Sequence, residues 1–388
     1  MRNNKKKKVF RCFTVHTSVD FVEGMIPYLS DKYDLLLLSS PGEGLSNIAE
    51  KYGLKYYAVS MARRMAPFKD IVSLFNLVRV FRKEKPDMVH SMTPKAGLLC
   101  MMAAMIAGVP IRIHTFTGLV WPTAQGLKRH LLMFTDKLTC GCATHIVPEG
   151  QGVLNDLKDH NITKKNLRVL GYGNIQGVDL GRFVRNRYLV RRKELIENYH
   201  LEDCFTFIFV GRVVRDKGMN ELVSAFAKLN QLHANTRLLL IGRLHKDIDA
   251  IAPETQLMID TNDSICTLGE IFGDELLAHY ISADCLVFPS YREGFPNTVL
   301  EAGALGLPSI VTDINGSREI IEDGKNGLIV PSKDADALCE AMKYVVENPQ
   351  ETQRMASNAR AMIASRFDCY FVRQCLYDYY EQLFEQNK

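Results

Sequence analysis

The chain has 388 residues, of which 47% are hydrophobic and 24% are charged, a composition typical of folded rather than disordered proteins. Its longest apolar run, residues 97–111, is shorter than the ~20 residues that cross a membrane, and its ten cysteines lack metal-ligand spacing. Together with a lysine-rich start that has no apolar signal segment, these features exclude a fibrous, secreted or membrane-spanning protein and predict two or three domains.

Charge is divided unevenly along the chain. Residues 1–178 hold 25 basic and 13 acidic residues, a net charge of +12, whereas residues 179–388 hold 23 and 31, a net charge of −8. The basic residues cluster at positions 2–8 and 63–85. A basic half predicts an encounter with anions. Because no aromatic residues alternate with the basic ones as stacking platforms for bases, we expect no nucleic-acid partner.

The first half alternates short apolar segments with helical ones. The expected strands are residues 9–15, 35–38, 56–59, 88–90, 111–114 and 145–147. This rhythm is typical of a parallel sheet with helices on both faces. Between the third and fourth strands, apolar residues recur at helical spacing among basic ones, namely Phe68, Ile71, Val72, Phe75, Val78 and Phe81. They predict either a surface helix with one face in the core or an amphipathic helix on an anionic bilayer.

After a glycine-rich segment at residues 171–181, the same rhythm restarts. The expected strands are residues 205–210, 237–242, 264–268, 285–288 and 309–311, with a helix at 221–229. We therefore expect an α/β protein of two doubly wound Rossmann-like domains, at residues 1–178 and 186–365, joined by a linker at 179–185. The aromatic residues 366–388 predict a helix that packs back on the first domain, with a place in the second domain as the alternative.

Two loops after strands of the second half carry chemistry suited to a diphosphate. In the loop from Gly211 to Gly218, Arg212 can form two parallel hydrogen bonds to phosphate oxygens, and Lys217 adds a compact charge. Ligands of open parallel sheets bind at the carboxyl ends of the strands, where this loop lies. A solvated basic turn is the alternative interpretation.

The second loop follows residues 285–288 and leads into a helix expected to begin near Pro296. Amides at such a helix start point towards an anion. Glu293 lies on the turn, where a sugar attached to the diphosphate would be, and Glu301 lies one helical turn further on, within reach of a ribose hydroxyl. The candidate donor-binding residues are Gly211, Arg212, Lys217, Glu293, Gly294, Phe295, Pro296, Asn297, Thr298 and Glu301.

These two loops, with Glu293 and Glu301 separated by seven residues, resemble the signature of the retaining glycosyltransferases of family 4. Further similar stretches are residues 283–290, 306–308 and 324–331. In the first half, residues 86–97, 126–129 and 171–179 resemble a bacterial subgroup that builds capsular, O-antigen or other glycan units on a polyprenyl diphosphate carrier.

The resemblance implies the GT-B fold, in which two Rossmann-like domains face each other across a cleft. It also implies transfer with retention from a nucleotide diphosphate-sugar, most commonly a UDP-sugar, without a metal or other cofactor. Arg212 and Lys217 would neutralise the departing diphosphate, Glu293 would hold the sugar, and Glu301 would hold the ribose. The Asp-x-Asp motif at residues 334–336 looks like a helix start rather than a metal loop.

The chain departs from the family pattern in one place. Many members carry a histidine after Thr-Phe in a strand-end loop of the first domain, where this chain has Thr117. The histidines at other strand ends, His16, His90 and His114, are candidates to replace it, although a packed histidine is the more common outcome. Lys95 is a candidate for the carrier diphosphate, or else a solvated lysine.

We therefore expect a cytoplasmic enzyme, peripheral at the inner face of the cytoplasmic membrane, that glycosylates a lipid-linked saccharide in surface polysaccharide assembly. Its expected partners are the sugar nucleotide, the polyprenyl diphosphate-linked acceptor and the anionic membrane surface. A nucleotide-sugar epimerase of the same fold, a phosphorylase and a non-catalytic scaffold of a glycan assembly complex are the alternatives. The intact set of Arg212, Lys217, Glu293 and Glu301 disfavours the scaffold, whereas Thr117 leaves it open.

Overall fold

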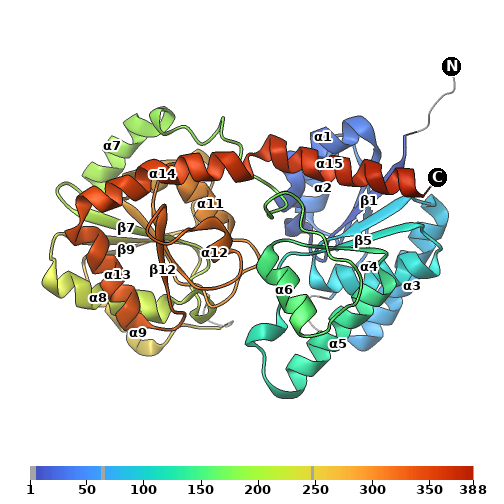
Figure 1. The fold of residues 1–388 in the computed structure, drawn as a ribbon, viewed down its shortest axis with the longest axis horizontal. Helices are drawn as coiled ribbons and strands as arrows, with labels where there is room; N and C mark the ends of the chain where they lie inside the picture. The colour runs from blue at the N-terminus through green and yellow to red at the C-terminus, as the bar shows by residue number, and fades with distance from the viewer. Residues whose placement is uncertain (1–5, 63–65, 246–248, 388) are drawn as a thin grey trace. The chain divides into compact units, whose positions relative to one another are not determined.

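The computed structural model describes residues 6–62, 66–245 and 249–387. The chain divides into two compact units, Met1–Gly177 with Tyr370–Lys388, and Val178–Cys369. Each unit is a parallel sheet with helices on both faces, which confirms the predicted α/β class (Figure 1). Of the basic clusters, residues 2–5 and 63–64 lie outside the described residues.

The sheet of the first unit has six parallel strands in the order β3-β2-β1-β4-β5-β6. They are β1 (Lys8–Cys12), β2 (Asp34–Ser39), β3 (Lys55–Ala58), β4 (Met88–Ser91), β5 (Ile111–Phe116) and β6 (His145–Pro148). Continuous apolar runs such as residues 35–38 are buried on both faces, as central parallel strands require. β1 is shorter than predicted, because the amide of Thr14 donates to the Thr93 hydroxyl (2.8 Å) instead of continuing the ladder.

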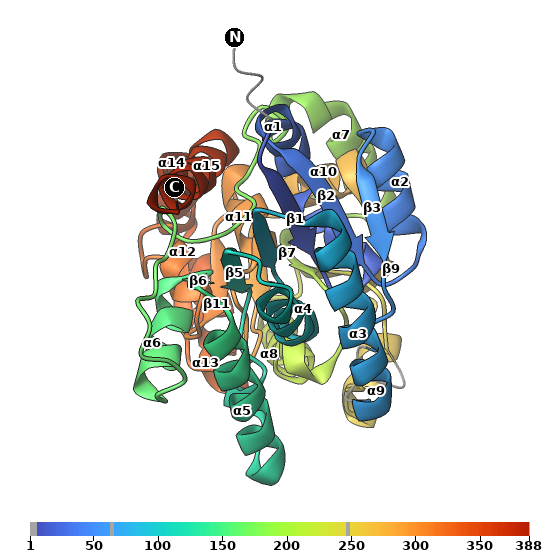
Figure 2. The same ribbon diagram turned by 90° about the vertical axis from the view of Figure 1, so that its right-hand side faces the viewer.

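Helices cover both faces of this sheet. On one face α3 (Pro67–Glu84), α4 (Pro94–Ile106) and α5 (Gly126–Cys142) lie side by side, as Figure 2 shows. α6 (Gln151–Asp159) contributes to the same apolar layer. The other layer holds α1 (Ile26–Lys32), α2 (Glu43–Lys51) and the 3-10 helix His16–Met25. The longest apolar run therefore forms most of α4 and the start of β5.

The C-terminal helix α15 (Cys369–Gln386) belongs to this first unit. Its buried side chains Val372, Leu376, Tyr380 and Leu383 pack in the same cluster as Val9 of β1. Burial of each large apolar side chain stabilises the fold by ~1.5–3 kcal/mol. The last residues of the chain thus complete the core that the first strand begins.

The second unit repeats the architecture, with strand order β12-β11-β10-β7-β8-β9. Its strands are β7 (Phe205–Val210), β8 (Thr236–Ile241), β9 (Ile265–Gly269), β10 (Cys285–Phe288), β11 (Ser309–Thr312) and β12 (Gly327–Val330). Its helices are α7 (Leu189–Asn198), α8 (Met219–Leu232), α9 (Pro253–Thr261), α10 (Gly273–Ser282), α11 (Asn297–Ala304), α12 (Ser317–Ile320), α13 (Ala335–Glu347) and α14 (Pro349–Phe367). Sequence analysis did not identify β12 as a strand, because its short segment follows a glycine turn and only half of it is buried.

Candidate functional site

The two loops predicted to bind a diphosphate lie against each other at the carboxyl ends of β7 and β10. The amide of Tyr291 donates to the carbonyl of Asp216 at 2.9 Å. Gly218 has a φ of 70°, and a Cβ there would stand 2.0 Å from the carbonyl oxygen of Pro289. Only glycine permits this approach, because any side chain at position 218 would clash with the second loop.

Two consecutive residues of the first loop form ion pairs with two consecutive residues of the second loop. Lys217 pairs with Glu293, and their side chains are only 15% and 16% exposed. Its neighbour Asp216 pairs with Arg292 at 2.9 Å. The Lys217 ammonium also lies 5.3 Å from the centre of the Phe288 ring. Each pair therefore joins a cation to an anion across the two loops, and the four charges neutralise one another.

Arg212 differs from Lys217 in this arrangement. Its side chain is exposed, and within the described parts of the chain it has no ion-pair partner. A guanidinium in that state keeps its full capacity for bidentate bonding to phosphate.

Glu301 lies inside α11, one turn from its start. The hydroxyl of Tyr280 on α10 donates to Glu301 Oε2 at 3.1 Å. Burial raises the pKa of Glu301 to about 7, because removal from water disfavours the charged form. The carboxyl can therefore change its protonation state near neutral pH.

The turn before α11 combines a ligand-facing edge with a buried anchor. Phe295 is buried and packs edge-on against Phe367, with 5.3 Å between the ring centres, so its side chain anchors the turn. Pro296 precedes the first residue of α11. The amides of a first helical turn have no acceptor within the helix, and they carry the positive end of its dipole. Gly294, Asn297 and Thr298 lie on this turn.

A cavity of about 500 Å³ opens beside these loops in the second unit. It is lined by Val213, Gly242, Arg243, Gly269 and Glu270, among other residues. Gly242 allows the close contact of its loop with the first donor loop, because a Cβ there would lie 1.7 Å from the carbonyl oxygen of Gly211. The cavity has the volume of a small-molecule site.

The histidines predicted at strand ends in the first unit occupy different environments. His90 and His114 are both buried. His90 contacts Thr115 through Nε2 (2.7 Å) and the Tyr380 hydroxyl through Nδ1, and burial and the Arg11 charge hold its pKa well below the usual range. Burial lowers the pKa of His114 to about 3. Both rings are buried and neutral at pH 7, which agrees with the alternative of a packed histidine; their assignment to the acceptor side stays a prediction.

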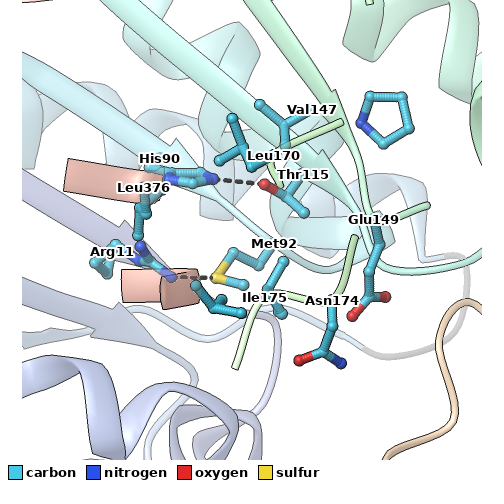
Figure 3. A pocket seen from close by; sticks show the side chains of 12 residues that line it. Arg11, His90, Met92, Thr115, Val147, Glu149, Leu170, Asn174, Ile175 and Leu376 are labelled. Atoms are coloured by element: carbon cyan, nitrogen blue, oxygen red, sulfur yellow. Dashed lines mark hydrogen bonds between the residues drawn. The ribbon is translucent and has the colours of Figure 1, made fainter. Parts of the chain in front are cut away.

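His90 lines a small internal cavity of about 20 Å³ in the first unit, shown in Figure 3. Arg11, Thr115, Glu149 and Asn174 also line it. Arg11 is only 1% exposed, contacts Tyr380 and Met92, and has an Nε with no hydrogen-bond partner in the described structure. The volume suffices for one water molecule rather than for a substrate.

The remaining acceptor-side candidates lie nearer the surface. His16 is half-buried, and its Nδ1 accepts a hydrogen bond from the Gly44 amide at 3.2 Å. Lys95, at the start of α4, pairs with Asp70 of α3 at 2.5 Å, so it is not a solvated lysine. Thr117 follows β5 and is half-buried. These three residues keep positions at the carboxyl edge of the first sheet.

α3 exposes apolar side chains to solvent. Phe68 is 88% and Phe75 69% exposed, and Ile71 and Val72 between them are also exposed. Lys69, Arg79, Arg82 and Lys83 are exposed on the same helix, whereas Leu77 and Phe81 reach the core. α3 is therefore a surface helix with one face in the core, and it also carries an apolar face among basic residues. Within the described residues, no helix is long and apolar enough to span a bilayer.

Sequence analysis missed the residues that support the donor loops. Asp249 accepts a hydrogen bond from the Asp216 amide (2.6 Å) and pairs with Arg215 (3.0 Å). Tyr291 donates to Glu221. Asp216 and Arg292 are next to the predicted residues Lys217 and Glu293, and this adjacency could have identified them. No feature of the sequence points to Tyr280. Across residues 6–62, 66–245 and 249–387, no group of three or more metal-ligating side chains is present.

Comparison of the chain with known proteins identifies its family. Residues 191–362 match the family described as glycosyl transferases group 1, and residues 30–173 match the glycosyl transferase 4-like domain. The capsular polysaccharide biosynthesis glycosyltransferase CapM of Staphylococcus aureus is 30% identical over 388 residues, which cover 99% of both chains.

Two further relatives are named for lipid-linked acceptors. The UDP-Gal:alpha-D-GlcNAc-diphosphoundecaprenol alpha-1,3-galactosyltransferase of Escherichia coli is 24% identical and covers 87% of this chain and 86% of its own. The N,N'-diacetylbacillosaminyl-diphospho-undecaprenol alpha-1,3-N-acetylgalactosaminyltransferase of Campylobacter jejuni is also 24% identical, covering 92% and 94%.

Among solved structures, HepE of Anabaena in complex with UDP is similar with a TM-score of 0.80 and 16% identity, covering 97% of this chain and 100% of that one. At this identity the likeness concerns the fold, which is GT-B. Because both units match glycosyltransferase families and CapM matches over the full length, the chain belongs to the group 1 glycosyltransferases.

Proposed function

We propose that this glycosyltransferase moves a sugar, with retention and without a metal, from a nucleotide diphosphate-sugar to a saccharide on a polyprenyl diphosphate carrier. The observation that carries the proposal is the joining of Lys217 and Glu293 at the strand ends that also place Arg212 and Glu301. These groups supply cations for a diphosphate and acceptors for sugar hydroxyls in one place.

The donor fits the second unit in a definite order. The diphosphate lies at Arg212, Lys217 and the start of α11, and the ribose lies at Glu301. The base extends into the cavity lined by Gly242, Gly269 and Glu270. UDP is favoured as the nucleotide, since the similar HepE structure contains UDP and the E. coli relative is named for UDP-Gal.

In the proposed reaction the acceptor hydroxyl attacks the anomeric carbon on the face from which the diphosphate leaves. The new carbon–oxygen bond forms as the bond to the β-phosphate oxygen breaks, and the hydroxyl proton passes to that oxygen. Arg212 and Lys217 stabilise the charge that develops on the diphosphate. Glu293 positions the sugar hydroxyls. The cations and the α11 dipole supply the positive charge that a metal supplies elsewhere.

A lipid-linked acceptor is supported by the names of the E. coli and C. jejuni relatives and by α3. Phe68, Ile71, Val72 and Phe75 offer an apolar face, and the neighbouring basic side chains complement anionic lipid headgroups. We therefore place the enzyme at the cytoplasmic face of the membrane, with Lys95, His16 and Thr117 as the acceptor-side residues.

The proposal is tested by thermal unfolding in EDTA with UDP, GDP, ADP or CMP. A ligand at 100 times its Kd adds ~2.7 kcal/mol of stability. We expect stabilisation by one nucleoside diphosphate and its loss in Lys217→Ala. Incubation of the matching sugar nucleotide with polyprenyl diphosphate-linked saccharides should then give an α-linked product from an α-linked donor.

The alternatives give different outcomes in the same experiments. An epimerase would alter the sugar nucleotide without an acceptor. A non-catalytic scaffold would support glycan assembly in cells equally well with Glu293→Ala. Absence of stabilisation by every nucleotide would refute the donor site.

A further inference from the structure

The proposed donor site contains an anion of its own, the carboxylate of Glu293. This carboxylate forms an ion pair with the Lys217 ammonium. This ammonium is the cation that the proposed function assigns to the donor diphosphate. Both side chains are more than four-fifths buried, so solvent screens their attraction less than it would at the surface. A diphosphate that binds Lys217 must therefore compete with Glu293.

We propose that donor binding is an exchange of anions, in which the arriving diphosphate displaces Glu293 from Lys217 and thereby frees Glu293 to accept hydrogen bonds from the donor sugar. This inference rests on the proposed function of the site and deepens it. It makes Glu293 a specificity-determining residue that opposes a nucleoside diphosphate alone and favours the same diphosphate when it carries a sugar.

The surrounding contacts keep the exchange local. Asp216 stays paired with Arg292 and bonded to the Tyr291 amide, so the two loops remain joined when Glu293 leaves Lys217. Gly218 and Pro289 hold the same contact through the backbone. We therefore expect Glu293 to leave Lys217 by a change of its side-chain rotamer, without a movement of the loop. Arg212, which is exposed and has no ion-pair partner in the described chain, offers the first contact to the incoming phosphates.

Lys217 can bond either to Glu293 or to a phosphate of the donor, and the balance between the two bonds decides the affinity. A charge-assisted bond from Lys217 to a phosphate replaces the bond to Glu293, and a sugar hydroxyl compensates the released carboxylate. Without a sugar, Glu293 is left beside the phosphate charge, and like charges at short distance repel. The sugar nucleotide is therefore preferred over the product diphosphate, which also assists product release.

The test compares the Kd of UDP and of a UDP-sugar by calorimetry in the wild type and in Glu293→Gln, a variant of equal size without the charge. We expect Glu293→Gln to bind UDP at least threefold more tightly and to lose most of the preference for the UDP-sugar over UDP. Glu340→Gln, on the exposed side of α13, is the matched control, because it removes one carboxylate outside both donor loops and leaves the Lys217–Glu293 pair in place; its preference should match that of the wild type.

A double-mutant cycle separates competition for Lys217 from a general effect on loop structure. In a Lys217→Met background the competition is absent and only the repulsion between Glu293 and the phosphates remains, so Glu293→Gln should tighten UDP binding by clearly less than it does in the wild-type background. Tightening of equal size in both backgrounds, or weaker or unchanged UDP binding in Glu293→Gln, overturns the inference although the donor site stands. A wild type that binds none of UDP, GDP, ADP and CMP refutes the proposed function itself.

Discussion

The hydroxyl of Tyr380 lies 3.0 Å from an Nη of Arg11, although the two residues are 369 positions apart in the chain. The same hydroxyl contacts His90 Nδ1, so one tyrosine of the last helix joins two strands of the first sheet. The layer between α15 and the sheet is otherwise mostly apolar. A buried cation in such a layer is costly unless its donors are bonded.

Tyr380→Phe should therefore destabilise the protein. It removes the partner of an Arg11 donor and of His90, and each buried group left without a partner costs ~1–3 kcal/mol. We expect a loss of ~2–3 kcal/mol in denaturant unfolding of the first unit. Tyr370→Phe on the same helix, where the ring is 72% exposed, is the control; an equal loss there would contradict the role of the network.

Arg212→Ala and Lys217→Ala should each weaken binding of the donor diphosphate by ~1.5–3 kcal/mol, the value of a charged hydrogen bond. Calorimetry with UDP measures both effects. The Lys217 variant also removes the partner of Glu293, so its loss includes repulsion from a carboxylate. An unchanged Kd in either variant would remove that residue from the phosphate site.

Affinity for the sugar nucleotide should rise with pH through about 7. The pKa of Glu301 is raised to about 7 by burial, so the carboxyl is largely protonated at pH 6 and ionised at pH 8, where it accepts bonds from both ribose hydroxyls. A UDP-sugar is the suitable probe, because its diphosphate does not titrate in this range. In Glu301→Gln the rise should vanish; a rise that remains would assign it to another group.

Asp136 predicts a pH-dependent stability in the first unit. It accepts a hydrogen bond from Trp121 Nε1 (3.1 Å), and burial raises its pKa from 3.8 to about 7. Its folded form thus binds a proton more tightly than its unfolded form, so stability falls as pH rises from about 4 to 7 and levels off above. Asp136→Asn should remove this fall and be more stable at pH 8 by an amount on the order of 2–4 kcal/mol. Parallel pH profiles of variant and wild type would exclude Asp136 as the cause.

The apolar face of α3 should bind anionic vesicles. Replacing Phe68, Ile71 and Phe75 with serine is expected to reduce cosedimentation with phosphatidylglycerol vesicles at least tenfold, because each side chain contributes apolar area. The exposed residues Val190, Leu232 and Leu257 of the second unit provide a control triple, whose binding should equal that of the wild type. Added salt should weaken binding; equal losses in both triples would contradict a specific face.

Local signals made most of the fold and the donor loops predictable. A run such as residues 35–38 is apolar on both faces, and this predicts a buried strand. The glycine turn before Glu301 predicts a helix start. Both features depend only on neighbouring residues in the sequence. Strand ends were less informative for His90 and His114. A side chain at a strand end points either to the ligand edge or into a helix layer, and the side that it takes depends on the register of the whole strand.

The features that the sequence did not predict depend on contacts between segments that are far apart in the chain. Arg11, a charged residue within a predicted buried strand, was a visible anomaly, but its partner Tyr380 lies almost a full chain length away. The pairing of Asp216 with Arg292 likewise depends on how two loops meet. Sequence left two places for the C-terminal helix, because aromatic residues at helical spacing suit either core; the packing of Tyr380 on the first sheet is a tertiary property.

The position of α15 also sets an order of assembly. The ribosome makes the strands of the first sheet before the second unit, but the helix that closes one side of this sheet consists of residues 369–386, which are made after the second unit. The second unit, residues 178–369, has all of its own segments before then. The first sheet is thus completed only after the second unit has been made, and a chain truncated before α15 would leave Val9, Phe13 and the Arg11 guanidinium without the cover of this helix.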